Sequence, residues 1–242
     1  MARESLQSYL DYLTRYLKRR ARGFNGYILG LSGGLDSAVV AILAQRAIKD
    51  DLLCVIIDIE SEKRDMDDAL ELCKLHNLNY YYIDLTAEYR AIVNKLEQSQ
   101  KLNDLSKINT KVRLRMVTLY ALGQTHGKLV LGTDNKAELY TGYFTKHGDG
   151  AADLFVLSSL TKGEVFAAAR MLGVTPNIIN KIPSAGLYVG QTDEAEMGIK
   201  YEDLDAFISG KEVAPHIEAR ALELHAISNH KRRPIPRPRE KR

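Results

Sequence analysis

The sequence has few cysteines and no long apolar run. It contains two cysteines in 242 residues, Cys54 and Cys73, and they form no C-x-x-C pair. Cys54 falls in an apolar stretch and Cys73 in an expected helix, so we expect both to be buried free thiols. No apolar segment approaches membrane-spanning length, and the N-terminus has no apolar core of a signal peptide. These absences predict a cytoplasmic protein with no membrane partner.

The chain also lacks a broad excess of one charge. Its net charge is +3, yet residues 230–242, HKRRPIPRPREKR, alone contribute +6. The rest of the chain therefore sums to about −3. The body of the protein offers no basic surface on the scale that nucleic acid requires, so we expect no nucleic-acid partner. Residues 235–242 are typical of a frayed, solvated, disordered tail.

Strand and helix patterns alternate along the chain. Strands are expected at 26–31, 52–59, 80–85 and 128–133, and helices at about 6–17, 37–49, 66–76, 110–122, 162–172, 201–208 and 215–227. Residues 138–153 and about 183–198 are expected to be irregular and glycine-containing. The alternation predicts an α/β fold in a single domain over residues 1–242. We expect a doubly wound parallel sheet with an N-terminal helix and C-terminal helices.

Two polar loops follow expected strands, residues 30–37 and residues 132–138. In doubly wound sheets, ligands bind beyond the carboxyl ends of the strands. We therefore expect these loops to converge on one ligand site.

The first of these loops, GLSGGLDS, is suited to phosphate. Its residues are Gly30, Leu31, Ser32, Gly33, Gly34, Leu35, Asp36 and Ser37. Glycine lets backbone wrap closely around an anion, and a helix N-terminus attracts negative charge. Phosphate would repel Asp36 unless a cation lies between them, which indicates Mg²⁺. The alternative is that Asp36 caps the following helix.

Several motifs carry a resemblance to a known family. S-G-G-x-D-S after a first strand is similar to the pyrophosphate loop of ATP pyrophosphatases, which cleave ATP to AMP and pyrophosphate. Residues 132–154, GTDNKAELYTGYFTKHGDGAADL, closely resemble the NAD synthetase pattern G-T-D-H-A-A-E-x-x-T-G-F-F-T-K-x-G-D-G-x-x-D. NTKVRLRM, LTK, YEDLDAFISGKEV and HKRRP also fall in that family's order. The resemblance runs from about Leu6 to Pro234. No glutaminase domain precedes it, so the chain resembles the short, ammonia-using form.

The resemblance implies a Rossmann-like fold of the adenine nucleotide hydrolase type and a two-step reaction. The carboxylate of deamido-NAD attacks the α-phosphorus of ATP and releases pyrophosphate. Ammonia then displaces AMP from the adenylate, which gives NAD. The substrates implied are ATP, deamido-NAD and ammonia, the cofactor is Mg²⁺, and the assembly is a homodimer. The apolar face of the first helix suits a dimer interface and packing on its own sheet equally well.

The resemblance also implies roles for single residues. It places ATP on residues 30–37, Thr133, Lys162 and Ser184, and Mg²⁺ on Asp36 and Glu138. It places deamido-NAD on Arg113, Lys146, Asp153, His230 and Lys231.

The catalytic residues that it implies are Lys162 and Asp149. Lys162 would stabilise the charge that develops as pyrophosphate leaves. Asp149 would hold ammonium and accept its proton. The residues alone leave simpler alternatives open: Lys162 as a solvated lysine, Glu138 as an exposed residue at a helix start, and Asp149 as part of an Asp-Gly turn.

Three departures from the family pattern stand out. Asn135 replaces the usual histidine, residues 60–69 lack the usual glutamine-containing pattern that would contact adenine, and residues 183–198 form a variant loop that we expect to move before ATP binds. The rival readings are a tRNA-modifying ATP pyrophosphatase and a non-catalytic nucleotide-binding module. The first predicts an RNA-binding surface. The second predicts the loss of Asp36, Glu138 or Lys162, and all three are present.

Overall fold

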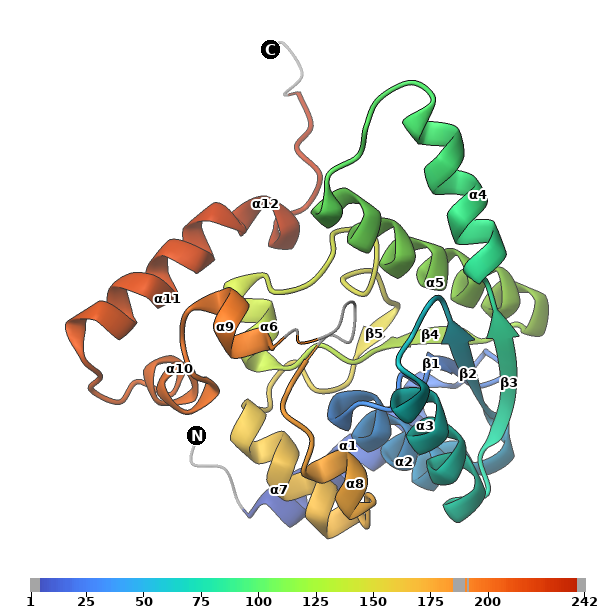
Figure 1. Ribbon diagram of the computed structural model, residues 1–242. Coiled ribbons are helices and arrows are strands. Elements are labelled where there is room, and N and C mark those ends of the chain that lie inside the picture. The colour runs from blue at the N-terminus through green and yellow to red at the C-terminus, as the bar shows by residue number, and fades with distance from the viewer. Residues whose placement is uncertain (1–4, 185–189, 191, 239–242) are drawn as a thin grey trace.

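The centre of the protein is a five-stranded sheet in which every pair of neighbouring strands is parallel. The computed structural model describes residues 5–184, 190 and 192–238 (Figure 1). The strands lie in the order β3-β2-β1-β4-β5. Their bounds are β1 Tyr27–Gly30, β2 Leu52–Asp58, β3 Asn79–Asp84, β4 Leu129–Gly132 and β5 Leu154–Phe155. The predicted α/β fold with a parallel sheet is confirmed.

Helices surround this sheet. Those before β4 are α1 Leu6–Arg20, α2 Leu35–Ile48, α3 Lys63–Leu75, α4 Thr86–Glu97 and α5 Asp104–His126, with a 3₁₀ turn at Lys49–Asp51. Those after β4 are α6 Lys136–Thr141, α7 Lys162–Leu172, α8 Pro176–Ile179, α9 Asp193–Met197, α10 Tyr201–Ile208, α11 Pro215–Ile227 and α12 Asn229–Arg232.

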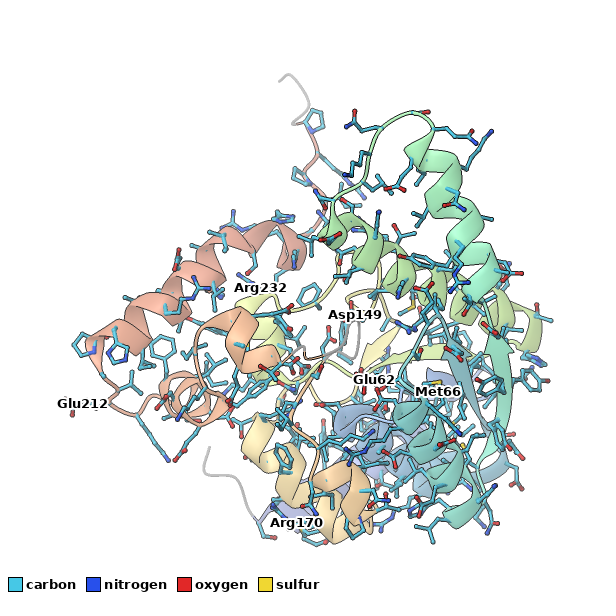
Figure 2. All side chains as sticks on the ribbon, viewed as in Figure 1. Glu62, Met66, Asp149, Arg170, Glu212 and Arg232 are labelled. Atoms are coloured by element: carbon cyan, nitrogen blue, oxygen red, sulfur yellow. The ribbon has the colours of Figure 1, made fainter. Side chains whose placement is uncertain are left out.

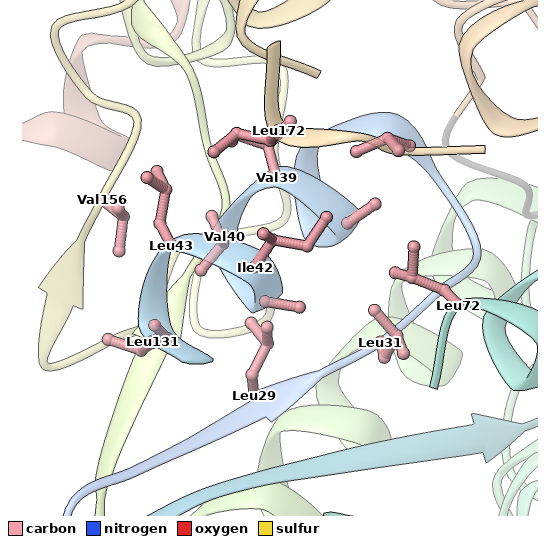
Figure 3. Close-up of a cluster of buried hydrophobic side chains, with 14 of the residues drawn as sticks. Leu29, Leu31, Val39, Val40, Ile42, Leu43, Leu72, Leu131, Val156 and Leu172 are labelled. Carbon is pink, nitrogen blue, oxygen red and sulfur yellow. The ribbon is translucent and has the colours of Figure 1, made fainter. Parts of the chain in front are cut away.

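The central strands β1, β2 and β4 are buried on both faces, which gives two apolar layers, whereas the edge strand β3 is mostly exposed. On one face, Leu29 and Leu131 pack with Val39 and Leu43 of α2, and α1, α3 and α7 complete this layer (Figure 3). On the other face, the alternate strand residues pack against α4 and α5, with Met116 and Leu119 among the α5 contacts. Successive side chains of a strand point to opposite faces, so a strand covered on both sides reads as a continuous apolar run.

The chain reverses its direction across the sheet between β1 and β4. β1 pairs with β2 on one side and with β4 on the other, whereas the chain runs from β1 through β2 and β3 before it returns to β4. This is the switch point at which open α/β sheets bind ligands. The loops after β1 and β4 therefore meet at one edge, as expected.

A smaller apolar cluster lies beside this edge. It joins α6, α10 and α11 through Ala137, Tyr201, Leu204 and Ala221, all buried. The cluster packs α10 and α11 against α6, the helix that follows β4 (Figure 1). The C-terminal helices thus form one wall of the switch point.

Several elements differ from the sequence-based expectation. α4 was not expected, and α5 begins at Asp104 rather than near residue 110. The region expected to be irregular, residues 138–153, overlaps the end of α6, and the unexpected strand β5 follows it directly; the later loop contains α9. Only two residues of α4, Tyr89 and Val93, are buried, so its apolar pattern is weak.

Other expectations can be compared directly with the structure. Cys54 and Cys73 are buried and free, as predicted. The apolar face of α1, with Leu10, Leu13 and Leu17, packs on the protein's own core, so that face is not left over for a partner. Within the described residues, no helix has the length and apolar character needed to cross a bilayer. Residues 239–242 of the basic tail, and residues 185–189 and 191 of the variant loop, lie outside the described part of the chain.

Candidate active site

The loop after β1 is organised by its own hydroxyl groups. Ser37 Oγ donates to the Gly34 carbonyl at 3.0 Å and lies 3.1 Å from Ser32 Oγ, and the Gly34 amide donates to Ser32 Oγ at 3.2 Å. Gly33 has φ +76°, and a Cβ there would lie 2.0 Å from the Asp65 carbonyl oxygen of α3. Only glycine fits this position, because the loop touches backbone and has a left-handed conformation.

Lys162 joins the two carboxylates that the sequence analysis singled out. Its Nζ lies 2.6 Å from Asp36 Oδ2 and 3.3 Å from Glu138 Oε1. The three residues come from α2, α6 and α7, and all are largely buried, with Lys162 only 3% exposed. Lys162 is therefore not a solvated lysine, Glu138 is not an exposed helix residue, and Asp36 does not serve as the N-cap of α2, a position held by Gly34.

Two acidic groups fix Lys162 in the first turn of α7. Thr161 and Glu164 form a capping box, in which each side chain accepts the other's backbone amide. Asp205 of α10 accepts the amides of Lys162 and Gly163, at 3.1 and 2.8 Å. A cation is unfavourable at a helix N-terminus, so the carboxylates of Asp36 and Glu138 must outweigh that repulsion.

The charges at this point do not balance, since one ammonium faces two carboxylates. Burial raises the pKa of Glu138 to about 7, and Asp36 adds to the rise while Lys162 opposes it. Burial lowers the pKa of Lys162, but Asp36 and Glu138 outweigh it, so the net shift is upward. Lys162 therefore stays charged, Asp36 is its closer partner, and Glu138 holds a proton more tightly than a free carboxyl does.

Asn135 connects the same two carboxylates. Its Nδ2 donates to Asp36 Oδ1 at 2.9 Å, and its backbone amide donates to Glu138 Oε2 at 3.0 Å. Its side chain also caps α6, accepting the amides of Ala137 and Glu138.

The donor set suits a cation that also takes ligands from a substrate. Among the described residues, no group of three or more His, Cys, Asp or Glu side chains is arranged to hold a metal ion. Asp36 and Glu138 alone would leave most positions around a cation to other ligands. Mg²⁺ commonly takes one or two carboxylates together with phosphate oxygens and water, so the pair fits Mg²⁺ held jointly with a nucleotide.

Asp149 lies near the centre of the molecule (Figure 2) and is tied into its own loop. Its Oδ1 accepts the amides of Thr145 and Gly150, at 2.7 and 3.2 Å. Burial raises the pKa of Asp149 to about 6, although these amides lower it. Lys231 donates to the carbonyls of Gly142 and Phe144, at 2.7 and 2.6 Å. Burial lowers the pKa of Lys231, and Asp149 acts against that shift.

The structure places the remaining predicted residues in different surroundings. Arg113 Nε donates to the Lys146 carbonyl at 3.2 Å, so these two come together. Asp153 Oδ2 accepts the Val130 amide at 2.8 Å, which gives Asp153 a structural contact at β4. His230 is exposed on α12.

The two remaining predicted ATP ligands lie at loop positions. Thr133 follows β4 directly and is partly buried. Ser184 is exposed and precedes the residues that the structure does not describe.

Sequence reasoning missed three side chains at the site. The Tyr201 hydroxyl lies 2.9 Å from Asp193 Oδ2 and 3.3 Å from Glu138 Oε1, and the Lys162 ammonium lies 4.9 Å from the centre of the Tyr201 ring. Asp134 is buried beside Asn135, and its Oδ2 accepts no hydrogen bond from the described residues. Tyr201 opens the YEDLDAF segment, which was the only sequence signal for it.

A phosphate-type loop at the switch point of a parallel sheet, with buried carboxylates and a lysine converging on it, defines a nucleotide-dependent enzyme of the ATP pyrophosphatase type. The sequence model of the NAD synthase family matches residues 5–234. The chain belongs to that family, whose members are ligases of NAD biosynthesis that use ATP.

Full-length relatives agree with this assignment. The NH₃-dependent NAD⁺ synthetase of Alkaliphilus oremlandii is 40% identical over 98% of both chains. The protein of the same name from Mesoplasma florum is 42% identical over 97% of this chain and 98% of its own. Among solved structures, the NMN synthetase of Francisella tularensis matches with a TM-score of 0.93 and 39% identity, over 98% of this chain and 99% of its own. The NH₃-dependent NAD synthetase of Campylobacter jejuni matches with a TM-score of 0.82 and 29% identity, over 98% and 100%.

Proposed function

We propose that this chain catalyses the ATP-dependent amidation of deamido-NAD by ammonia, which yields NAD, AMP and pyrophosphate. The observation that carries the proposal is the convergence of Asp36, Glu138 and Lys162 beside the loop 30–37. Membership of the NAD synthase family supports the same reaction. The ligand roles of single residues below belong to this proposal.

In the first step, an oxygen of the pyridine carboxylate attacks the α-phosphorus of ATP. The bond from that phosphorus to the bridging oxygen breaks, and pyrophosphate leaves with the electron pair. The backbone of residues 30–37 would hold the departing phosphates, with Thr133 and Ser184 as further ATP contacts. Lys162 would stabilise the negative charge that grows on them, because a fixed cation acts strongly in a buried site.

In the second step, ammonia attacks the activated acyl carbon and AMP leaves. The nitrogen loses one proton, and ammonium must lose another before it can act as a nucleophile. Asp149 would accept a proton; its raised pKa of about 6 supports this role, because such a carboxylate is a better base than an ordinary one. Arg113, Lys146, Asp153, His230 and Lys231 would bind deamido-NAD.

Mg²⁺ is the cofactor that the proposed chemistry requires. Asp36 and Glu138 would hold it. When bound, it would neutralise charge on the ATP phosphates. We also propose a homodimer in the cytoplasm.

A second acceptor is supported by one relative. The solved structure with TM-score 0.93 is named an NMN synthetase. Nicotinate mononucleotide, whose amide is NMN, is therefore the alternative substrate for the same chemistry at the same site.

A direct assay tests both acceptors. Purified protein is incubated with ATP, Mg²⁺ and ¹⁵N-ammonium, and with either deamido-NAD or nicotinate mononucleotide. We expect ¹⁵N-labelled NAD, AMP and pyrophosphate in equal amounts. A larger kcat/KM with nicotinate mononucleotide than with deamido-NAD would show that the mononucleotide is the preferred acceptor. Release of ADP and phosphate, or no amide from either acid, would refute the proposed function.

A further inference from the structure

Asn135 makes more contacts than a helix cap needs. Its Oδ1 accepts the amides of Ala137 and Glu138, at 3.0 and 3.1 Å, and this alone caps α6. Its Nδ2 takes no part in the cap and donates instead to Asp36 Oδ1 at 2.9 Å. Asp36 lies 99 positions earlier in the chain, on another helix.

These contacts fix the orientation of the amide. The two backbone N–H groups require an acceptor, so the end that faces them is the oxygen. The opposite end faces a carboxylate and must be the donor. Asn135 is fully buried, and a buried NH₂ group without a partner would be costly. The residue therefore depends on Asp36 as much as Asp36 depends on it.

The network around Asn135 reaches both carboxylates. Its backbone amide donates to Glu138 Oε2 at 3.0 Å, on the side of that carboxylate away from the Oε1 atom that Lys162 approaches. Asp36 likewise presents Oδ1 to Asn135 and Oδ2 to Lys162. One residue thus fixes one oxygen of each carboxylate and leaves the other oxygen turned toward the shared cation position.

We propose that Asn135 is a positioning residue that sets the distance and orientation of Asp36 and Glu138, so that both present one oxygen to a single divalent cation bound with ATP. This inference rests on the proposed function for the identity of the nucleotide. Groups that orient metal ligands commonly change metal affinity by roughly 10–100-fold when they are removed.

Two substitutions separate positioning from capping. Asn135→Ser and Asn135→Thr both keep a side-chain oxygen that caps a helix, but neither reaches Asp36 with a donor. Asn103 offers the matched control, because it caps α5 through the Ser106 amide at 2.8 Å and is exposed. Asn103→Ser makes the same chemical change away from the site.

The measurement is Mn²⁺ binding to the full chain in the presence of α,β-methylene-ATP, followed by electron paramagnetic resonance. We expect Asn135→Ser and Asn135→Thr to raise the Kd for Mn²⁺ by about 10–100-fold, with Asn103→Ser unchanged. Circular dichroism checks that each variant is folded. A Kd within twofold of the wild type in both Asn135 variants would overturn the inference, as would an equal change in Asn103→Ser or an absence of Mn²⁺ binding to the wild type.

This outcome is separate from that of the amidation assay, since no acceptor acid is present. Wild-type protein that forms NAD while the Asn135 variants bind Mn²⁺ normally would leave the proposed function standing and refute only the role of Asn135. If the wild type makes no amide but the Asn135→Ser variant binds Mn²⁺ more weakly than the wild type does, the role of Asn135 would stand and the proposed function would be refuted.

Discussion

Lys162 Nζ lies 2.6 Å from Asp36 Oδ2, although 126 positions separate the two residues in the sequence. The same ammonium lies 3.3 Å from Glu138 Oε1, so one positive charge faces both carboxylates that are the proposed metal ligands. Lys162 therefore contacts one kind of anion in the structure, the carboxylates, and would contact another, the phosphates of ATP, in the proposed reaction.

Lys162→Met tests the role of the ammonium in the first chemical step. The substitution keeps the length of the side chain and removes the charge. We expect pyrophosphate release in a single turnover to slow by roughly 10²–10³-fold, as when a group that stabilises transition-state charge is removed. Lys211→Met, at an exposed position after α10, is the control. A rate within threefold of the wild type would show that Lys162 does not stabilise the departing pyrophosphate.

The same substitution should change metal binding in the absence of ATP. The ammonium and a divalent cation compete for Asp36 and Glu138, and removing the ammonium leaves two buried carboxylates without a counter-charge. Lys162→Met is expected to bind Mn²⁺ without nucleotide more tightly than the wild type, measured by isothermal titration calorimetry. Equal affinities would mean that the cation does not bind between these carboxylates. A lower thermal stability of the metal-free variant is also expected.

The raised pKa of Asp149 predicts a pH dependence. Its pKa rises from 3.8 to about 6, chiefly through burial, so the folded protein binds this proton more tightly than the unfolded chain does. The contribution of Asp149 to the free energy of unfolding therefore falls as the pH rises from about 4 to 6. In thermal melts between these pH values, the Tm of Asp149→Asn should change less with pH than the Tm of the wild type. If Asp149 is also the proton acceptor, amide formation by the wild type should fall below about pH 6.

The capping box of α7 gives a prediction for stability. Thr161 Oγ1 accepts the Glu164 amide, and this cap starts the helix that carries Lys162. Thr161→Ala should lower the free energy of unfolding by about 1 kcal/mol, a fall in Tm of roughly 2–4 °C for a domain of this size. Thr161→Ser keeps the hydroxyl and should melt close to the wild type. Identical melting of the Ala and Ser variants would contradict the role of the cap.

Lys181 lies outside the loop 30–37 that would bind ATP, but its contacts with that loop lead us to expect an effect on ATP binding. Its Nζ donates to the Gly33 carbonyl at 3.1 Å and pairs with Asp65 and Asp68, at 2.5 and 2.6 Å. Lys181→Met should free the loop from α3, and the KM for ATP should rise about tenfold, the order expected for losing one hydrogen bond to a charged group, with a smaller change in kcat. Steady-state kinetics measure both constants. Lys74→Met, an exposed change on α3, is the control, and an unchanged KM in Lys181→Met would refute the prediction.

The sequence predicted elements with a strong local signal and missed those without one. The branched apolar run of β2 and the T-x-x-E box of α7 identify their elements directly, and both are present. α4 was not predicted, because only Tyr89 and Val93 are buried and two residues are too few to show the apolar periodicity of a helix. α6 has six residues and depends on Asn135 and on packing against α10 and α11. Short helices of this kind are stable mainly through tertiary contacts.

The candidate site also has features that the sequence predicted and features that only the structure shows. The sequence by itself determined the phosphate-type loop, the residue types around it and the family, because these depend on neighbouring residues and on motif order. It left open whether Lys162 was solvated and assigned no contact to Asn135. Only the tertiary structure decided that Lys162 is buried between Asp36 and Glu138, and that Asn135 holds both carboxylates. A buried charge needs a partner in space, and that partner is chosen by the packing of α2, α6 and α7, over separations that no local pattern records.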